Sequence, residues 1–274
     1  MYNNNIDKIV KILKSSKNLI ITAGAGMGVD SGLPDFRSKE GFWQAYPPYK
    51  KLNLSFYEAA NPATFIDNPK FAWGFYGHRL NLYRKTTPHK GFYYLQEWIN
   101  ALSLNYFIIT SNVDGQFQKS GFDEEHIYEV HGSIHYLQCL IPCCKAIWEN
   151  NVEFHIDENT MCSDFVPICP YCGSTARPNI LMFGDFGWIS DRSDRQESNF
   201  YNWLNNSLYN NTIILEIGAG NAVPTIRHLT YRLATQTNGT IVRINPNEYA
   251  IEEPHISLPM RALEALELIN NNLK

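Results

Sequence analysis

The sequence contains no run of about 18 consecutive apolar residues, the length that a transmembrane helix requires. Its N-terminal segment also lacks the basic start, continuous apolar stretch and small-residue cleavage site of a secretory signal peptide. No cluster of lysine and arginine is present, and the formal net charge is −4, so we expect no binding to nucleic acid or acidic membranes. We expect a monomeric, cytoplasmic protein.

Charged residues and cysteines are both sparse. Charged residues make up 18% of the chain and hydrophobic residues 44%, a balance typical of a folded globular protein. Six cysteines in 274 residues indicate reduced thiols that could hold a metal, rather than a disulfide scaffold. A chain of this length accommodates one large domain and a smaller module.

Four continuous apolar segments predict strands that are buried on both faces: residues 17–22, 106–110, 212–218 and 239–245. Helical spacing of apolar residues is found in residues 6–13, 89–102 and 222–236. This alternation of strand and helix predicts an α/β fold with a Rossmann-like, doubly wound parallel sheet.

Two segments interrupt the alternation. Residues 41–85 are rich in aromatic residues and are broken by prolines, whereas residues 138–173 contain every cysteine. We therefore predict two domains that are each discontinuous in sequence. The Rossmann-like domain is formed by residues 5–40, 86–134 and 178–274, and the small domain by residues 41–85 (helical module) and 135–177 (zinc-ribbon-like module).

Gly24, Gly26 and Gly28 follow the first predicted strand. Glycines at such a position let the backbone approach a pyrophosphate, which amide N–H groups and a following helix N-terminus can bind. Glycines that end a strand also form simple tight turns, so this feature alone leaves both interpretations open. A dehydrogenase would carry an acidic residue about 20 positions later, after a second strand, and none is present.

Several motifs, in order, closely resemble those of the sirtuin family. Residues 24–37 (GAGMGVDSGLPDFR) resemble its NAD-binding signature, and residues 110–114 (TSNVD) resemble its second signature. His131-Gly132-Ser133 resembles the catalytic histidine segment. They are followed by the cysteines, by residues 183–185 (FGD) and 218–220 (GAG), and by residues 245–248 (NPNE).

The resemblance implies that the protein binds NAD as a co-substrate. It implies that Phe36 and Arg37 lie near the nicotinamide ribose, and that Asn245 and Glu248 lie near the adenosine. The residues assigned to cofactor binding in this way are Gly24, Ala25, Gly26, Asp35, Phe36, Arg37, Ser111, Asn112, Asp114, Gly218, Ala219, Gly220, Asn245 and Glu248.

The resemblance also implies a reaction, the NAD-dependent removal of acyl groups from lysine in a protein substrate. Its catalytic residues would be His131, Asn112 and Asp114, and its products nicotinamide, free lysine and O-acyl-ADP-ribose. A histidine titrates near neutral pH and can accept a proton from a ribose hydroxyl. A satisfied histidine at a strand end, and an Asn/Asp turn after a strand, are the structural alternatives.

Two close pairs of cysteines are separated by about 25 residues of sequence: Cys139 with Cys143, and Cys169 with Cys172. Four thiolates complete a tetrahedral zinc site and leave no position for substrate, so we predict a structural Zn²⁺ ion. Cys144 could replace Cys143 as a ligand, and Cys162 is expected to be a spare thiol.

Tyr76 and Arg79 resemble the Tyr-x-x-Arg pair with which desuccinylases and demalonylases of this family hold an acidic acyl group. Residues three apart share a helix face, so a phenol and a guanidinium could converge on one carboxylate. An ordinary amphipathic helix is the structural alternative. The resemblance also assigns Phe183 and Gly184 to the substrate site.

The sequence departs from the family pattern at several positions. Ser111 stands where glutamine is usual, Met27-Gly28 replaces a pair that ends in serine, and Ala219-Gly220 replaces Thr-Ser. These changes leave the NAD chemistry in place but put the acyl acceptor in doubt. A mono-ADP-ribosyltransferase or an NAD hydrolase on the same scaffold is therefore an alternative, and an NAD-sensing binding module is a non-enzymatic one.

Overall fold

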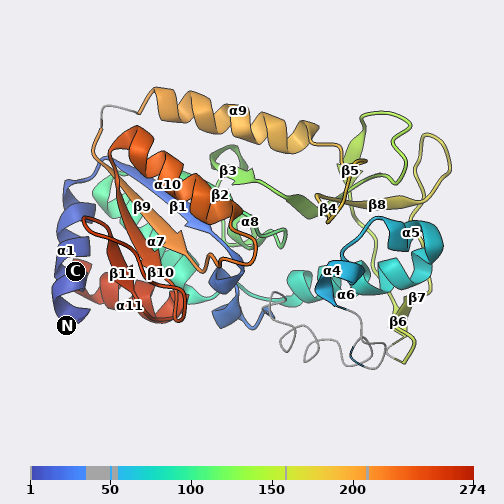
Figure 1. Ribbon diagram of the computed structural model, residues 1–274, viewed down its shortest axis with the longest axis horizontal. Helices are drawn as coiled ribbons and strands as arrows, with labels where there is room; N and C mark the ends of the chain where they lie inside the picture. Colours follow the sequence, from blue (N-terminus) through green and yellow to red (C-terminus); the bar gives the residue numbers. More distant parts are fainter. Residues whose placement is uncertain (1, 35–49, 51–54, 158, 208–209) are drawn as a thin grey trace.

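The computed structural model describes residues 2–34, 50, 55–157, 159–207 and 210–274. Within these residues a helix-covered parallel sheet forms one end of the molecule, and a smaller region of short strands and helices forms the other (Figure 1). The chain crosses between the two regions several times, so each is assembled from separate stretches of sequence.

The larger region is built on six parallel strands in the order β11-β10-β9-β1-β2-β3. Their bounds are β1 (Asn18–Ala23), β2 (Asn105–Thr110), β3 (Ile127–Glu129), β9 (Thr212–Ile217), β10 (Thr240–Ile244) and β11 (Ile256–Leu258). The two central strands are β9 and β1. The chain continues from β1 to its neighbour β2 on one side, and from β9 to its neighbour β10 on the other. Such a switch point leaves a crevice at the carboxyl ends of the two central strands, where α/β proteins bind their ligands.

Helices cover both faces of the sheet (Figure 1). The helices α1 (Tyr2–Ser15), α7 (Lys90–Leu102) and α11 (Ala262–Leu273) share one hydrophobic cluster, and α9 (Asp191–Asn205) and α10 (Thr225–Thr237) share another. In β1, Leu19 and Ile21 belong to the first cluster and Ile20 to the second. Alternate side chains of a strand point to opposite faces, so every residue of β1 is buried.

The smaller region combines a helical part with a cysteine-rich part. Its elements are α4 (Phe56–Ala59), α5 (Ala63–Asp67), α6 (Pro69–Lys85), β4 (Gly132–Cys139), β5 (Ile147–Glu149), β6 (Ile156–Asp157), β7 (Cys162–Ser163) and β8 (Ala176–Ile180). An antiparallel sheet of order β5-β4-β8 and a β6-β7 pair form the cysteine-rich part. One hydrophobic cluster includes residues of both parts, so the two insertions pack as one unit.

Helix α6 is held tightly in this unit. Asn68 caps its N-terminus by accepting a hydrogen bond from Phe71 N–H, and Trp73 Nε1 donates to the Ala176 carbonyl at 2.9 Å. A Cβ atom at Gly74 would lie 1.8 Å from the Met161 carbonyl oxygen, so glycine is required for β7 to approach the helix. These contacts therefore fix the position of α6, which carries Tyr76 and Arg79.

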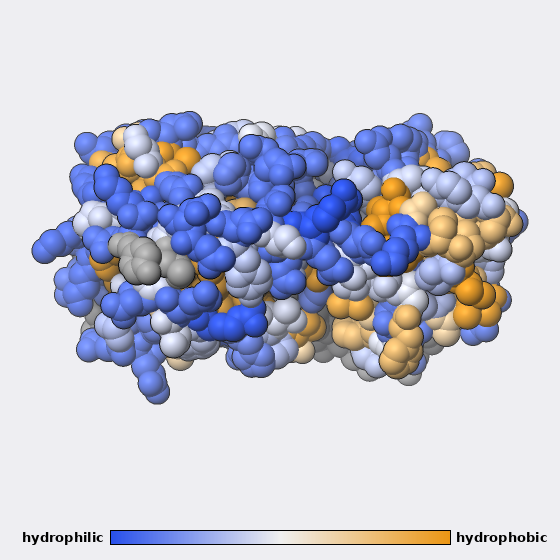
Figure 2. Space-filling model, turned by 90° about the horizontal axis from the view of Figure 1, so that it is seen from above, coloured by the Kyte–Doolittle hydropathy of each residue, from blue (hydrophilic) through white to orange (hydrophobic). Residues whose placement is uncertain are grey.

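Short elements follow two strands of the parallel sheet: η1 (Ala25–Met27) and η2 (Val29–Ser31) after β1, and α8 (Gln116–Lys119) and η3 (Glu124–His126) between β2 and β3. Hydrophilic residues cover most of the larger region seen from above, and hydrophobic ones gather over the smaller region (Figure 2). The most exposed large apolar side chains of the smaller region are Ile66, Ile141, Ile168, Tyr171 and Phe186.

The predicted α/β fold, doubly wound sheet and smaller region are confirmed. All four predicted strands are present, but β3 and β11 were not predicted because each has only three residues. No helix in the described part of the chain is long and apolar enough to span a membrane. The exact boundaries between the two domains stay a prediction.

Candidate active site

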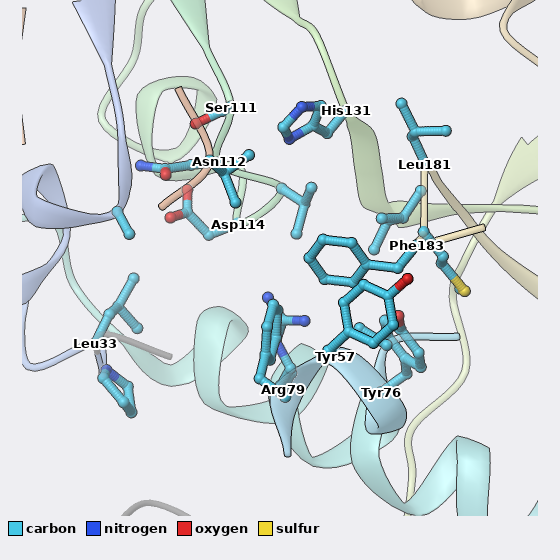
Figure 3. Close-up of a pocket in the computed structure, with 18 of the residues that line it drawn as sticks. Leu33, Tyr57, Tyr76, Arg79, Ser111, Asn112, Asp114, His131, Leu181 and Phe183 are labelled. Atoms are coloured by element: carbon cyan, nitrogen blue, oxygen red, sulfur yellow. The ribbon is translucent and has the colours of Figure 1, made fainter. Parts of the chain in front are cut away.

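A cavity of about 530 Å³ opens at the carboxyl edge of the parallel sheet (Figure 3). Tyr57 and Leu181 line it and are 57% and 38% exposed, so its mouth lies beside them. Its walls come from the turn after β1, the loop after β2, helices α4 and α6, and the segment after β8. They include Ala25, Tyr76, Arg79, Tyr83, Ser111, Asn112, Asp114, His131 and Phe183.

The turns after β1 and β9 pack directly on each other at one end of this crevice. Gly24 N–H donates to the Ile217 carbonyl at 2.9 Å, and Gly26 N–H donates to the Gly218 carbonyl at 3.1 Å. A Cβ atom at Gly26 would lie 2.6 Å from Gly218 Cα, and Gly218 itself has φ +64°. Both positions therefore require glycine. The predicted cofactor residues of the two turns are thus brought together.

The loop after β2 is tied to the turn after β1. Asn112 Nδ2 donates to the Gly24 carbonyl at 3.0 Å, and Asn112 N–H donates to Thr110 Oγ1 at 3.0 Å. Figure 3 shows the amide nitrogen of Asn112 turned toward β1 and away from the cavity. Ser111 is buried and also lines the cavity. The asparagine therefore holds two walls of the site at a fixed separation.

Asp114 is a buried carboxylate in the cavity wall. Burial raises the pKa of its carboxyl group from 3.8 to about 6, and the negative charge of Glu129 adds to this rise. A hydrogen bond from Gln116 N–H at 2.9 Å and the positive charge of Arg79 lower the pKa and offset part of the rise. Asp114 is therefore mostly ionised at neutral pH.

His131 lies immediately before β4, at the junction of the two regions. Leu181 N–H donates to the His131 carbonyl at 3.0 Å, and Gly132 pairs with Ile180 in β8. In the view of Figure 3, its imidazole ring lies on the same side of the cavity as Asn112, and Arg79 lies on the opposite side. The structure brings the three predicted catalytic residues to one cavity.

Asn245 and Glu248 lie beside the turn after β9 without lining the cavity. Asn245 Nδ2 donates to the Ala219 carbonyl at 2.9 Å, while the Glu248 carboxylate accepts hydrogen bonds from Asn221 N–H and Nδ2 at 2.8 and 3.0 Å. Arg227 also donates to the Ala219 carbonyl, at 2.8 Å. These hydrogen bonds fix the backbone of the turn after β9.

The predicted cofactor residues Asp35, Phe36 and Arg37 lie outside the described residues. Of the predicted substrate residues, Tyr76, Arg79 and Phe183 line the cavity, and Gly184 does not. The ring centroid of Phe183 lies 4.5 Å from that of Tyr57 and 6.0 Å from that of Phe56. An aromatic wall therefore faces the mouth of the cavity.

Arg177 and Asp185 form a buried ion pair beneath this wall. Arg177 Nη1 donates to Asp185 Oδ1 at 2.9 Å, and Nη2 donates to Oδ2 and to the Ile180 carbonyl. Asp185 also accepts hydrogen bonds from Met182 N–H and Gly187 N–H. The segment that carries Phe183 and Gly184 is thus fixed by a buried, fully hydrogen-bonded ion pair.

Cys139, Cys143, Cys169 and Cys172 bring their sulfur atoms within 4.8 Å of one another. The Sγ–Sγ distance is 3.6 Å for Cys139 with Cys172 and 3.8 Å for Cys143 with Cys169. Four sulfurs at about 2.3 Å from a tetrahedral Zn²⁺ would be about 3.8 Å apart, so the arrangement fits this ion. The cluster includes Cys143 and not Cys144, so its geometry favours Cys143 as the second ligand.

Two histidines that sequence reasoning missed support the site. His135 Nε2 lies 3.0 Å from the Asp114 carbonyl, to which the ring donates because a carbonyl oxygen can only accept. His89 accepts a hydrogen bond from Gly91 N–H at Nδ1, so its Nε2–H donates to the Met27 carbonyl at 2.9 Å. His89 is the first residue of the predicted helical segment 89–102, and the structure places it at the N-cap of α7.

We predict that Asp114→Asn stabilises the fold at neutral pH. The pKa of the Asp114 carboxyl group is about 6 in the folded chain, against 3.8 for an unperturbed aspartate. As far as this group is concerned, the folded chain is therefore most stable below pH 4, where the group is neutral in both states, and it loses stability as the pH rises through 6. Asparagine stays neutral and can still accept the hydrogen bond from Gln116 N–H. Urea denaturation should show a gain of up to about 3 kcal/mol at pH 7.5 and little gain at pH 4.

The exposed Asp164 provides the control, since Asp164→Asn removes a charge that is not buried and should change stability little at either pH. A loss of stability in Asp114→Asn at pH 7.5 would contradict the cost assigned to the buried carboxylate.

We predict about one zinc ion per chain in the purified protein, held by the four-cysteine cluster. Cys169→Ser should lose the metal and unfold at a lower temperature. A structural metal binds only the folded chain, so its binding free energy adds to the free energy of unfolding. Cys144→Ser is the matched control and should keep the metal and the wild-type thermal midpoint. Elemental analysis and thermal unfolding measure these outcomes; a metal-free wild-type protein of unchanged stability would argue against the site.

The sequence model of the Sir2 family matches residues 24–194, more than half of the chain. The NAD-dependent protein deacylase of Pyrococcus abyssi is 29% identical to this chain, over 90% of this chain and 88% of the relative. The NAD-dependent protein deacetylase of Saccharolobus solfataricus is also 29% identical, over 92% of this chain and 94% of the relative.

Solved structures of Sir2 proteins superpose on nearly the whole chain. A mutant Sir2 homologue in complex with ADP-ribose has a TM-score of 0.71 and 26% identity, with 97% of this chain and 96% of that one covered. A Sir2 homologue in complex with NAD has a TM-score of 0.72 and 24% identity, with 97% and 93% covered, and supports the same fold. The sheet order, the paired cysteines and these matches together show that the chain belongs to the Sir2 family.

Proposed function

We propose that this chain is an NAD-dependent protein-lysine deacylase that releases nicotinamide, deacylated lysine and O-acyl-ADP-ribose. The observation that carries the proposal is the convergence of Asn112, Asp114 and His131 on one cavity at the switch point of the sheet. Membership of the Sir2 family and relatives named NAD-dependent protein deacylase or deacetylase support it.

The residues at the crevice fit NAD. The close packing of Gly26 on Gly218 removes side chains from the place where a pyrophosphate must approach the backbone. When bound, NAD supplies a ribose carbon from which nicotinamide can be displaced by the amide oxygen of an acylated lysine. Ala25, Ser111, Asn112 and Asp114 line the cavity beside these turns and would bind the nicotinamide end.

Asp114 would bind the carboxamide of nicotinamide. Its burial strengthens any hydrogen bond that it accepts, because the local dielectric constant is low. Its position is fixed from two directions, by the Gln116 N–H bond to its carboxylate and by the His135 ring on its carbonyl. Asn112 is held by Gly24 and would contact the nicotinamide ribose. These residues therefore orient the leaving group before the bond breaks.

His131 would act as the general base. It accepts the proton of a ribose hydroxyl, so that this oxygen can attack the carbon of the acyl group. A histidine suits this step because its pKa lies near neutral pH in the absence of strong perturbation. The four-cysteine cluster lies at the far end of β4 and is proposed to hold structure only, since four thiolates leave no open position on the metal.

The finer part of the proposal concerns the acyl group. Arg79 and Tyr76 line the cavity from α6, and the guanidinium of Arg79 points into it (Figure 3). A buried cation in a largely aromatic wall favours an acyl chain that ends in a carboxylate, such as succinyl or malonyl. Acetyl would fit the same cavity without this contact. We propose desuccinylase or demalonylase activity alongside deacetylation.

Transfer of ADP-ribose to a protein, or hydrolysis of NAD, remains the second candidate, because several hydroxyl and amide side chains of the family pattern are replaced. The deciding experiment incubates the protein with NAD, with and without acetyl-, succinyl- and malonyl-lysine peptides. Nicotinamide release that requires an acylated peptide supports deacylation. Release without any peptide, or label transferred from NAD to protein, would support the second candidate instead.

We predict that His131→Ala abolishes peptide-dependent nicotinamide release while NAD still binds, because the base is lost but the turns that hold NAD are intact. A loss of 100-fold or more is expected, as is typical of a removed general base, which contributes roughly 10²–10⁴-fold. Isothermal titration with NAD checks binding. The exposed His228→Ala is the matched control, and full turnover in His131→Ala would refute the assigned base.

We predict that Arg79→Met selectively weakens removal of succinyl and malonyl groups. Methionine keeps an apolar side chain of similar length but removes the charge, so kcat/KM should fall at least about tenfold for acidic acyl peptides and little for acetyl. The surface residue Arg232, which donates to the Tyr201 hydroxyl at 3.0 Å, gives the control Arg232→Met. An equal loss on all three peptides would reject the acyl-carboxylate role.

A further inference from the structure

Helix α6 presents a third polar side chain to the cavity, one that the Tyr-x-x-Arg pattern does not contain. Tyr76, Arg79 and Tyr83 are spaced by three and four residues, so they lie along one face of the helix. All three line the cavity and are buried, at 1%, 7% and 4% exposure. The acyl end of the cavity is therefore lined by two phenols and one guanidinium from a single rigid element.

Arg79 is held by Tyr83. Arg79 Nε and Nη2 donate to the Tyr83 hydroxyl oxygen at 3.0 and 2.7 Å, so one edge of the guanidinium is held by one phenol. The guanidinium carbon also lies 5.2–5.8 Å from four aromatic ring centroids, those of Phe56, Phe75, Tyr76 and Tyr83. Cation–π contacts and hydrogen bonds together fix the orientation of the charge.

The Tyr83 hydroxyl has a proton to give. Its oxygen accepts from Arg79, and within the described residues its own proton has no hydrogen-bond acceptor. Burial raises the pKa of Tyr83, so the phenol stays protonated over the physiological range. Gln116 Nε2 donates to the Tyr83 carbonyl at 3.3 Å and connects this part of α6 to the loop that carries Asp114.

Tyr76 is in a different environment. Its ring is stacked on that of Phe65, with 5.5 Å between the centroids, and packs edge-on against Phe75 at 5.0 Å. No hydrogen bond links its hydroxyl to Arg79 among the described residues. The phenol that is coupled directly to the cation is thus Tyr83, four residues beyond Arg79, rather than Tyr76.

We propose that Tyr83 determines specificity for acidic acyl groups, with its hydroxyl donating to a carboxylate at the end of the acyl chain while Arg79 pairs with the charge. The substrate class is a lysine acylated with a dicarboxylic acid. A carboxylate in this position accepts one hydrogen bond from a neutral phenol and more from a guanidinium, which compensates for its loss of water. This inference rests on the deacylase function proposed above.

The test replaces Tyr83 by phenylalanine, which keeps the ring and removes only the hydroxyl. We expect kcat/KM for succinyl- and malonyl-lysine peptides to fall about tenfold or more, and that for acetyl-lysine to stay within about twofold. Affinity for the succinyl peptide without NAD, measured by titration calorimetry, should fall by a similar factor. Tyr201→Phe, which removes a phenol that accepts from Arg232 on the surface, is the control for loss of an Arg–Tyr contact.

The pair Tyr83→Phe and Arg79→Met also defines a double-mutant cycle. The double variant should lose little more than Arg79→Met alone, because both residues act on one carboxylate. Losses on all three peptides alike in Tyr83→Phe, or an undiminished succinyl activity, would overturn the inference. A larger selective loss in Tyr76→Phe than in Tyr83→Phe would overturn it as well.

The outcomes separate this inference from the proposed function. A wild-type protein that removes acetyl groups but shows no acidic acyl activity refutes the role of Tyr83 and leaves the deacylase proposal intact. A folded protein that binds NAD yet turns over no acylated peptide refutes the deacylase proposal itself.

Discussion

The packing of the turn after β1 on the turn after β9 is the constraint on which the site depends. Gly26 and Gly218 approach so closely that neither can carry a side chain, and this contact fixes the two central strands at their carboxyl ends. The Gly24 carbonyl then accepts a hydrogen bond from Asn112, which sets the position of the loop after β2. That loop carries Asp114, so the position of this buried carboxylate follows from the contact of two backbones.

Much of this arrangement could be predicted from the sequence, because it depends on local patterns. Continuous apolar runs predicted β1, β2, β9 and β10, and the ordered motifs pointed to Asn112, Asp114 and His131, which the structure brings to one cavity. The short strands β3 and β11 could not be predicted, since three residues give no periodicity. The support of Asp114 by His135, 21 residues away, and of Arg79 by Tyr83 depends on side-chain direction and burial, which a single sequence does not specify.

The buried charges in and near the cavity are compensated to different degrees. Arg177 and Asp185 compensate each other almost completely and act as a fixed support. Asp114 is compensated only in part, by one backbone N–H and the field of Arg79, and its raised pKa is the result. Incomplete compensation costs stability, but it leaves the Asp114 carboxylate able to accept further hydrogen bonds. The Arg177–Asp185 pair and the Asp114 carboxylate thus differ in how far their charges are compensated.

Strand β4 connects the proposed chemistry to the metal cluster. His131 immediately precedes the strand and Cys139 ends it, so the proposed base and the first cysteine are the two ends of one short extended segment. Pairing with β8 continues from Gly132 at one end to Cys139 at the other, with an irregularity between Ser133 and Leu137. A metal that fixes Cys139 would therefore restrain the register of β4 against β8, and the segment after β8 carries Phe183 into the cavity wall. The cluster can in this way influence the geometry of the site without contacting NAD or substrate.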